Sequence, residues 1–354
     1  MMNPPKRLAL AGLGLAMFLT ACKRADAPAQ TAISPPAVEQ ANPSTPATSV
    51  ATSTGSEPAL LPGPNAVPKD TRVVVNIPAF RMDLFADGNL VKSYRIGIGY
   101  PQFQIPRGLR TAQTVIFNPT WTQPHESWAS NPGAVVPAGS KSNPLGPIKI
   151  PIGGPSLIHG GKPLEKIGTF ASHGCVGLTN DQVKDFARML VGASGTDLTE
   201  ETFSNYLGKR TQTQVVKLEK LVPVELRYET IVLEDGRLHI YRDVYNQNTN
   251  TEENLRVLLE SSGVKLDDLE DGERTEILDA LNAMSNRRQK KSAPTPSPAA
   301  TQTPTEKSLA AANRKAEAER EKQLRNQKEI VIEIKQLSAK GYPGPVNFDT
   351  GAKN

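Results

Sequence analysis

The sequence predicts a mainly β domain with a few helices, set between linkers and followed by a partly helical extension. Short runs of β-branched and other apolar residues recur over 71–117 and again over 215–241, and such runs are typical of strands. Asp-Gly pairs begin at Asp87 and Asp235, each between two of these runs, and this dipeptide favours a tight hairpin turn. Two stretches between the groups of strands carry apolar residues at helical spacing. Strands are therefore expected to dominate the domain.

The strands of this domain are expected to begin near Thr71. The first run continues through Met82 and Leu84 to the hairpin at Asp87. The expected strands are 73–77, 82–84, 90–98, 114–117, 215–216, 224–233 and 238–241.

A long polar stretch interrupts the strands. Residues 118–155 are rich in Pro, Gly, Ser and Asn, which favour turns and loops. A loop of this length inside a compact domain is usually functional, so we expect it to border the groove in which a substrate binds.

Both expected helices carry start and stop signals. The first follows Thr179, which is placed to form a capping box with Gln182, and it is expected to end near Gly192. Apolar residues at helical spacing give it a face that can pack on the sheet: Val183, Phe186, Ala187 and Leu190. The second helix has similar signals: Thr199 at its start, Leu198 and Phe203 as a hydrophobic staple, and Gly208 at its end.

The extension after residue 245 shows weaker signals. Residues 246–291 contain Leu and Ile at helical spacing, which predicts two short helices. A linker rich in Pro, Ser and Thr follows at 292–305. Over 306–354 the sequence predicts a solvated helix, then a short strand in which Ile330, Ile332 and Ile334 alternate, and a flexible tail.

The composition fits one domain with long linkers. The chain has 354 residues, 30 prolines and a hydrophobic fraction of 38%, so part of it is expected not to contribute to a core. The net charge of +5 suits an anionic surface such as a cell wall or phospholipid. Much of the basic excess lies near the C-terminus, and no nucleic-acid site is expected.

Residues 1–22 predict an export signal. Lys6 and Arg7 precede an apolar run that ends in Leu19-Thr20-Ala21-Cys22, and this run is too short to span a bilayer as a helix. The ending resembles the lipobox of bacterial lipoproteins, in which the Cys is lipidated and becomes the mature N-terminus. An ordinary cleaved signal with an incidental Cys22 is the alternative. Residues 23–68 are mostly Ala, Pro, Ser and Thr, which predicts a disordered tether.

Cys175 is the expected centre of the chemistry. With Cys22 lipidated, Cys175 has no partner for an intramolecular disulfide, so in an exported chain it is expected to be present for its reactivity. A thiol needs a nearby base to act as a nucleophile at neutral pH, and His159 and His173 are the candidates. Gly174 directly precedes Cys175 and can let backbone N–H groups face a developing oxyanion.

These residues form a pattern that resembles a known signature. His159-Gly160, then a spacer, then Ser172-His173-Gly174-Cys175, Val176 and Asn180 match the signature of the L,D-transpeptidase catalytic domain family. Two upstream segments resemble further landmarks of that family, Pro106-Arg107-Gly108 and Asn118-Pro119-Thr120-Trp121. The resemblance covers about residues 71–245. Members of the family cross-link peptidoglycan.

The resemblance implies a fold, a reaction and a set of roles. The fold would be an L,D-transpeptidase-like mixed β-sandwich. Cys175 would attack a peptidoglycan stem tetrapeptide and release D-alanine, leaving a thioester that an amine of a second stem or of a wall-anchored protein then attacks. His159 would be the base, held by the carbonyl of Gly160, while Ser172, His173 and Gly174 support the turn and the oxyanion. No cofactor and no metal are implied.

One departure from the signature leaves alternatives open. The family usually has Arg two positions after the Cys, whereas this chain has Gly177. The basic residues nearest the motifs that could replace that Arg are Arg107, Arg110, Lys149 and Lys162. Gly177 is also the only sequence argument for an inactive wall-binding lipoprotein.

Two other reactions remain open on the sequence alone. Water as the acceptor would make the chain an L,D-carboxypeptidase. A zinc site formed by His159, His173 and Cys175 is a further possibility, since residues two apart on an extended strand point to the same side.

Overall fold

The computed structural model describes residues 67–285, 327–338 and 340–348, and all of these fall in the same compact unit of the chain. The predicted signal with Cys22 and the linker at 292–305 lie outside the described residues, as do most of the tether and the helix expected after residue 306. Within the described ranges, no helix is both long enough and apolar enough to cross a membrane.

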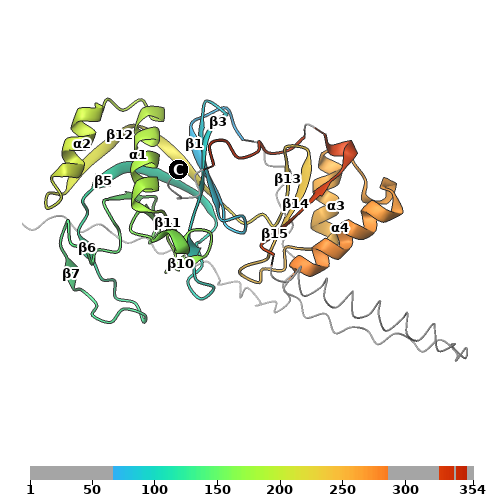
Figure 1. Ribbon diagram of the computed structural model, residues 1–354, viewed down its shortest axis with the longest axis horizontal. Helices are drawn as coiled ribbons and strands as arrows, with labels where there is room; N and C mark the ends of the chain where they lie inside the picture. Colours follow the sequence, from blue (N-terminus) through green and yellow to red (C-terminus); the bar gives the residue numbers. More distant parts are fainter. Residues whose placement is uncertain (1–66, 286–326, 339, 349–354) are drawn as a thin grey trace, which may run out of the picture. The chain divides into compact units, whose positions relative to one another are not determined.

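A mixed eight-stranded sheet forms the first core and confirms the mainly β prediction (Figure 1). Its strand order is β11-β9-β8-β5-β12-β1-β2-β3. Neighbours are antiparallel except for β1 with β12 and β11 with β9, which are parallel. The bounds are β1 (Arg72–Asn76), β2 (Arg81–Ala86), β3 (Asn89–Arg95), β5 (Gly108–Phe117), β8 (Ile148–Pro151), β9 (Leu157–His159), β11 (Val176–Gly177) and β12 (Gln214–Arg227).

The hairpin between β2 and β3 confirms the first Asp-Gly signal. Asp87 and Gly88 have φ angles of 51° and 80°, the left-handed conformation that the two central residues of this turn require. Val73, Val75, Met82 and Leu84 around the turn are fully buried in the core.

The sheet curls until its two ends meet. Gly97, just after β3, and Gly177, on β11, exchange two backbone hydrogen bonds of 2.8 Å. Beside this contact a short parallel pair forms between β4 (Ile98–Gly99) and β10 (Phe170–Ser172). The strand that follows Cys175 is therefore held between β9 on one side and Gly97 on the other.

The stretch predicted as a long loop contains more structure than expected. It includes the small ribbon of β6 (Trp121–Thr122) and β7 (Val135–Val136), and also β8, which joins the main sheet between β5 and β9. The loop prediction was wrong for β8. Its buried residues, Ile148 and Ile150, alternate over only four residues between prolines, which is too short a run to show a period.

Both predicted helices are confirmed. They are α1 (Asn180–Ala193) and α2 (Glu200–Gly208), and the Thr179–Gln182 capping box is complete. Helix α1 buries Val183, Phe186 and Leu190 in the core of the main sheet. Full burial of each such side chain stabilises the fold by about 1.5–3 kcal/mol, so α1 is firmly attached just after the Cys175 turn.

A second core lies outside the main sheet, and it corrects the domain boundary predicted at residue 245. Strands β13 (Ile231–Glu234), β14 (Arg237–Tyr241) and β15 (Glu329–Glu333) form a three-stranded antiparallel sheet. Their apolar residues pack with α3 (Glu252–Ser261) and α4 (Asp271–Met284). The second Asp-Gly hairpin is therefore correct, but its strands belong with the C-terminal extension, because β15 pairs with β14 from far along the chain and α3 and α4 pack with both strands.

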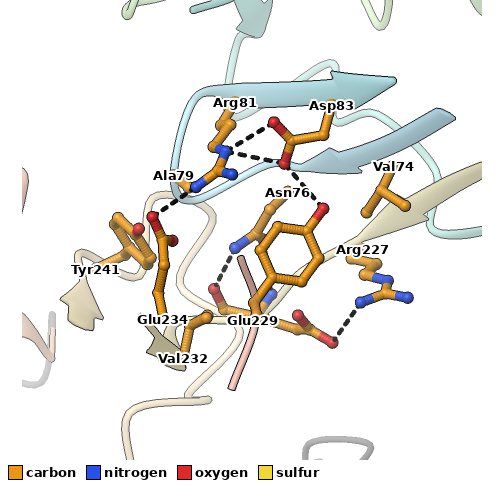
Figure 2. A pocket seen from close by; sticks show the side chains of 11 residues that line it. Val74, Asn76, Ala79, Arg81, Asp83, Arg227, Glu229, Val232, Glu234 and Tyr241 are labelled. Carbon is orange, nitrogen blue, oxygen red and sulfur yellow. Dashed lines mark hydrogen bonds and ion pairs between the residues drawn. The ribbon is translucent and has the colours of Figure 1, made fainter. Parts of the chain in front are cut away.

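The segment 340–348 corrects the expectation of a flexible tail. Figure 2 shows Arg81, whose guanidinium lies 2.8 Å from Asp83 and 2.7 Å from Glu234. The hydroxyl of Tyr342 donates to Asp83 at 2.8 Å, and the backbone N–H of Ser93 donates to Val346 at 2.9 Å. These side chains pair with one another, so the small polar pocket they line is explained by the packing of this segment against β1–β3.

Candidate active site

The parallel pairing of β9 with β11 brings Cys175 close to His159. In this register Val176 faces Ile158, and Gly177 faces His159. Val176 and Ile158 are fully buried in the core. Side chains alternate along a strand, so Cys175, one residue before β11, lies on the same face as His159 and diagonally across from it. Hydrogen bonding from the backbone of Leu157, the first residue of β9, lowers the pKa of this thiol.

The orientation of His159 is set by one short hydrogen bond. Its Nδ1 lies 2.7 Å from the carbonyl oxygen of Gly160, and the ring is buried. A carbonyl can only accept, so we assign the proton to Nδ1, which leaves Nε2 as the basic nitrogen. The loop after Gly160 is fixed by α1, because the backbone N–H of Gly161 donates to Asn180 Oδ1 at 2.8 Å.

The environment of His159 keeps its imidazole neutral. Burial, together with the positive charges of Lys162 and Lys149, lowers its pKa to about 3, and only the hydrogen bond to Gly160 opposes this shift. A neutral imidazole can accept a proton throughout the physiological pH range.

The turn that carries Cys175 is closed by the Ser172 side chain. Ser172 Oγ accepts from the backbone N–H of Cys175 at 3.0 Å and donates to the Cys175 carbonyl at 2.6 Å. Gly174 has a φ of +101°, which favours glycine, and its carbonyl accepts from Ser156 Oγ at 2.9 Å. The nucleophile candidate therefore sits on a rigid turn.

The thiol of Cys175 is free and half-buried. Burial raises its pKa, while the Leu157 hydrogen bond and the charge of Lys162 lower it. The thiol is therefore mainly protonated at neutral pH. With a neutral His159 nearby, the arrangement suits transfer of the thiol proton to the imidazole as sulfur attacks.

His173 is exposed and lies beside the turn, in a cluster with three half-buried aromatic residues. Its ring stacks on Trp128 with centroids 3.9 Å apart, and it also contacts Phe103 and Tyr100 at 4.7 and 5.5 Å. Trp128 comes from the polar loop expected to border the groove. The sequence analysis did not identify Trp128, although an aromatic residue in a polar loop is a signal for a contact surface.

Gly177 is covered by the side chain of Lys162. A Cβ built at Gly177 would lie 2.8 Å from Lys162 Cγ and 3.0 Å from its Cε. Two of the four basic residues near the motifs, Lys149 and Lys162, lower the pKa of His159 through their positive charge. Of these four, only Lys162 also lowers the pKa of Cys175. Arg107 is exposed.

The three residues of the possible zinc site do not form one. Among the residues that the structure describes, no group of three or more His, Cys, Asp and Glu side chains is placed to hold a metal ion. His159 is buried against Gly160, whereas the exposed His173 stacks on Trp128.

Comparison with known proteins gives a consistent picture. Residues 70–216 match the family model described as the L,D-transpeptidase catalytic domain (YkuD). A curated relative, the probable L,D-transpeptidase ErfK/SrfK of Escherichia coli (strain K12), is 34% identical over 120 residues, which are 32% of this chain and 38% of that protein.

Solved structures of L,D-transpeptidases match this chain at lower sequence identity. The NMR structure of the catalytic domain of an E. faecium L,D-transpeptidase is 16% identical, with coverage of 45% of this chain and 98% of that one and a TM-score of 0.30. An L,D-transpeptidase from Mycobacterium smegmatis is also 16% identical, with coverage of 45% and 58% and a TM-score of 0.28.

Proposed function

Because residues 70–216 belong to the L,D-transpeptidase catalytic domain family, we propose that this chain transfers acyl groups between peptidoglycan stem peptides through a thioester at Cys175. The observation that carries the proposal is the hydrogen bond that holds His159 Nδ1 on the Gly160 carbonyl beside the Cys175 turn. It leaves Nε2 available as a base on the face where Cys175 lies.

The first half of the reaction forms the thioester. The Cys175 sulfur attacks the carbonyl carbon of the penultimate stem residue while His159 Nε2 takes the thiol proton. The tetrahedral intermediate then collapses, and the C–N bond to D-alanine breaks as the imidazolium returns the proton to the leaving amine. The acyl group remains on sulfur.

The second half releases the product. An amine of a second stem, or of a wall-anchored protein, attacks the thioester carbonyl and gives its proton to His159. Collapse breaks the C–S bond, and the imidazolium proton returns to the sulfur, so Cys175 and His159 regain their starting states.

The oxyanion of both intermediates needs hydrogen-bond donors near the turn. The N–H of Cys175 donates to Ser172 Oγ. We therefore assign the oxyanion to the preceding N–H groups, those of His173 and Gly174, whose orientation the positive φ of Gly174 sets. Ser172 and Gly160 support this arrangement through their hydrogen bonds to Cys175 and His159.

The aromatic cluster supports a position for the substrate. His173 and Trp128 stack beside the turn, with Phe103 and Tyr100 next to them. Their rings offer flat apolar surface with little conformational freedom to lose on binding, so we assign them to one wall of the stem-peptide groove.

Transfer is tested with the purified chain and disaccharide tetrapeptides whose third residue is either diaminopimelate or lysine. Mass spectrometry should detect a dimer that lacks one D-alanine, and intact-protein spectra should show one carbapenem adduct per chain at Cys175, because acylation by a strained lactam needs only the thiol, its base and the oxyanion donors. If a tripeptide were the only product, the chain would catalyse hydrolysis and not transfer. No consumption of either substrate by folded protein would overturn the proposal.

We also propose that Cys22 is lipidated and anchors the chain to a membrane, with the folded part outside the cytoplasm. The support is the export signal followed by Leu19-Thr20-Ala21-Cys22. The mature chain should partition into detergent, since two or more acyl chains give stable anchoring, whereas Cys22→Ser should remain in the aqueous phase. An unmodified N-terminus downstream of Cys22, found by mass spectrometry, would contradict lipidation.

A further inference from the structure

Lys162 and Gly177 fit together as a pair. The backbone N–H of Lys162 donates to the Leu178 carbonyl at 3.1 Å, which fixes the residue alongside β11. From there its alkyl chain crosses Gly177, where an added Cβ would lie 2.8 Å from Cγ, 3.0 Å from Cε and 3.3 Å from Cδ. Real Cβ atoms essentially never approach a heavy atom as closely as 2.8 Å. The lysine therefore occupies the space that a side chain at position 177 would need.

The Lys162 side chain runs along the face that carries the reacting groups, because it covers the Cβ position of Gly177, which pairs with His159 and lies two residues after Cys175 on the same face. Its positive charge lowers the pKa of Cys175, of His159 and of His173. Burial lowers the pKa of Lys162 itself, the Cys175 charge raises it, and the charge of Lys166 lowers it. Lys149 is the other cation that acts on His159.

We propose that Lys162, held across Gly177, is the positioning residue whose ammonium stabilises the thiolate of Cys175, and that position 177 must be glycine to leave room for it. The proposal rests on the proposed function, in which Cys175 is the nucleophile. Lys162 follows β9 and lies on the same side of β11 as His159, and in the part of the chain that the structure describes it is the only cation whose charge lowers the pKa of Cys175.

The charge of Lys162 selects one protonation state of the pair. A cation near both groups favours a thiolate and disfavours an imidazolium. Lys162 therefore favours a thiolate next to a neutral His159. Loss of the ammonium should make the thiol harder to ionise and leave the backbone of the turn in place.

The test is the pH profile of Cys175 alkylation by iodoacetamide, a neutral probe that the lysine does not attract. All proteins are full-length chains in a Cys22→Ser background, so that intact-protein mass follows Cys175 alone. Lys162→Met keeps the length of the side chain and removes its charge. It should raise the apparent pKa of alkylation by about one unit and slow the reaction at pH 7 about tenfold. Lys162→Arg should restore the wild-type profile.

Lys166→Met is the matched control. Lys166 is an exposed lysine four positions further along the same segment. Its charge lowers the pKa of Lys162 but is not among the causes that shift the pKa of Cys175. The rate of Cys175 alkylation in Lys166→Met should stay within about twofold of the wild-type rate, since surface charges are well screened. A Lys162→Met profile that superposes on the wild-type profile would overturn the inference.

Gly177→Ala provides a second, independent measurement. The new methyl group should displace the lysine and slow alkylation about as much as Lys162→Met does, and the double variant should be no slower than either single one. If the double variant were slower by the product of the two single effects on the alkylation rate, Lys162 and Gly177 would act independently, which would contradict their pairing. Because alkylation needs no peptidoglycan, the profile decides this inference whether or not the transfer assay succeeds, and a failed transfer assay bears only on the proposed function.

Discussion

Replacing Cys175 by serine should lower transfer by at least about 10³-fold and abolish the carbapenem adduct, because an alcohol is a far weaker nucleophile than a thiolate. The two side chains differ by one atom of similar size, and the turn is held by Ser172, Gly174 and Ser156 rather than by the sulfur. The variant should therefore remain folded. The measurements are the yield of cross-linked dimer and the intact mass after exposure to a carbapenem.

The matched control for this variant is Cys22→Ser, which removes the other cysteine of the chain. It should retain full transfer in detergent-free assays with soluble substrates. Wild-type turnover by Cys175→Ser, or an adduct that persists in it, would remove Cys175 from the mechanism.

His159 should make the stability of the protein strongly dependent on pH. Burial lowers its pKa in the folded state to about 3, from an ordinary value of 6.5. Below pH 6.5 the unfolded chain binds a proton that the folded chain does not bind. The free energy of unfolding should therefore be largest above pH 6.5 and fall as pH decreases toward 3, with a slope of up to about 1.4 kcal/mol per pH unit.

The measurement is urea unfolding at several pH values between 7.5 and 4.5. His159→Gln removes the titrating ring, so the difference in the free energy of unfolding between wild type and variant isolates its contribution. The wild type should lose about 2 kcal/mol more than the variant over this range, a conservative value for so buried a group. His125→Gln, an exposed loop position, should behave like the wild type. Equal slopes for wild type and His159→Gln would mean that the ring is not buried as described.

The sequence predicted the features that depend on neighbouring residues. The Asp87-Gly88 hairpin and the Thr179 capping box depend on residues within a few positions, and the chemistry of a turn or cap is visible in such a short window. The likeness of the Ser172–Cys175 segment to a known signature similarly identified the stretch where a nucleophile could lie.

Features that depend on distant segments could not be predicted. Strand β15 pairs with β14 across about 90 residues, and this pairing, with the packing of α3 and α4, shows that β13 and β14 belong to the second core. The stacking of Trp128 on His173 and the placement of Lys162 over Gly177 are also tertiary contacts. The sequence offered four basic residues without a way to choose among them, whereas the fold places one of them, Lys162, across Gly177 and near enough to act on the pKa of Cys175.

The closure of the curled sheet limits how a peptide can bind. Many proteins recognise extended peptides by letting them add as an extra strand to an open sheet edge. At Gly177 both backbone hydrogen-bonding groups are already used by Gly97, so the proposed stem-peptide substrate cannot continue the sheet beside Cys175. Recognition must then come from side chains and from loops such as the one that carries Trp128. Such a surface can change its preferred stem or acceptor by loop substitutions that leave the strands under Cys175 and His159 intact.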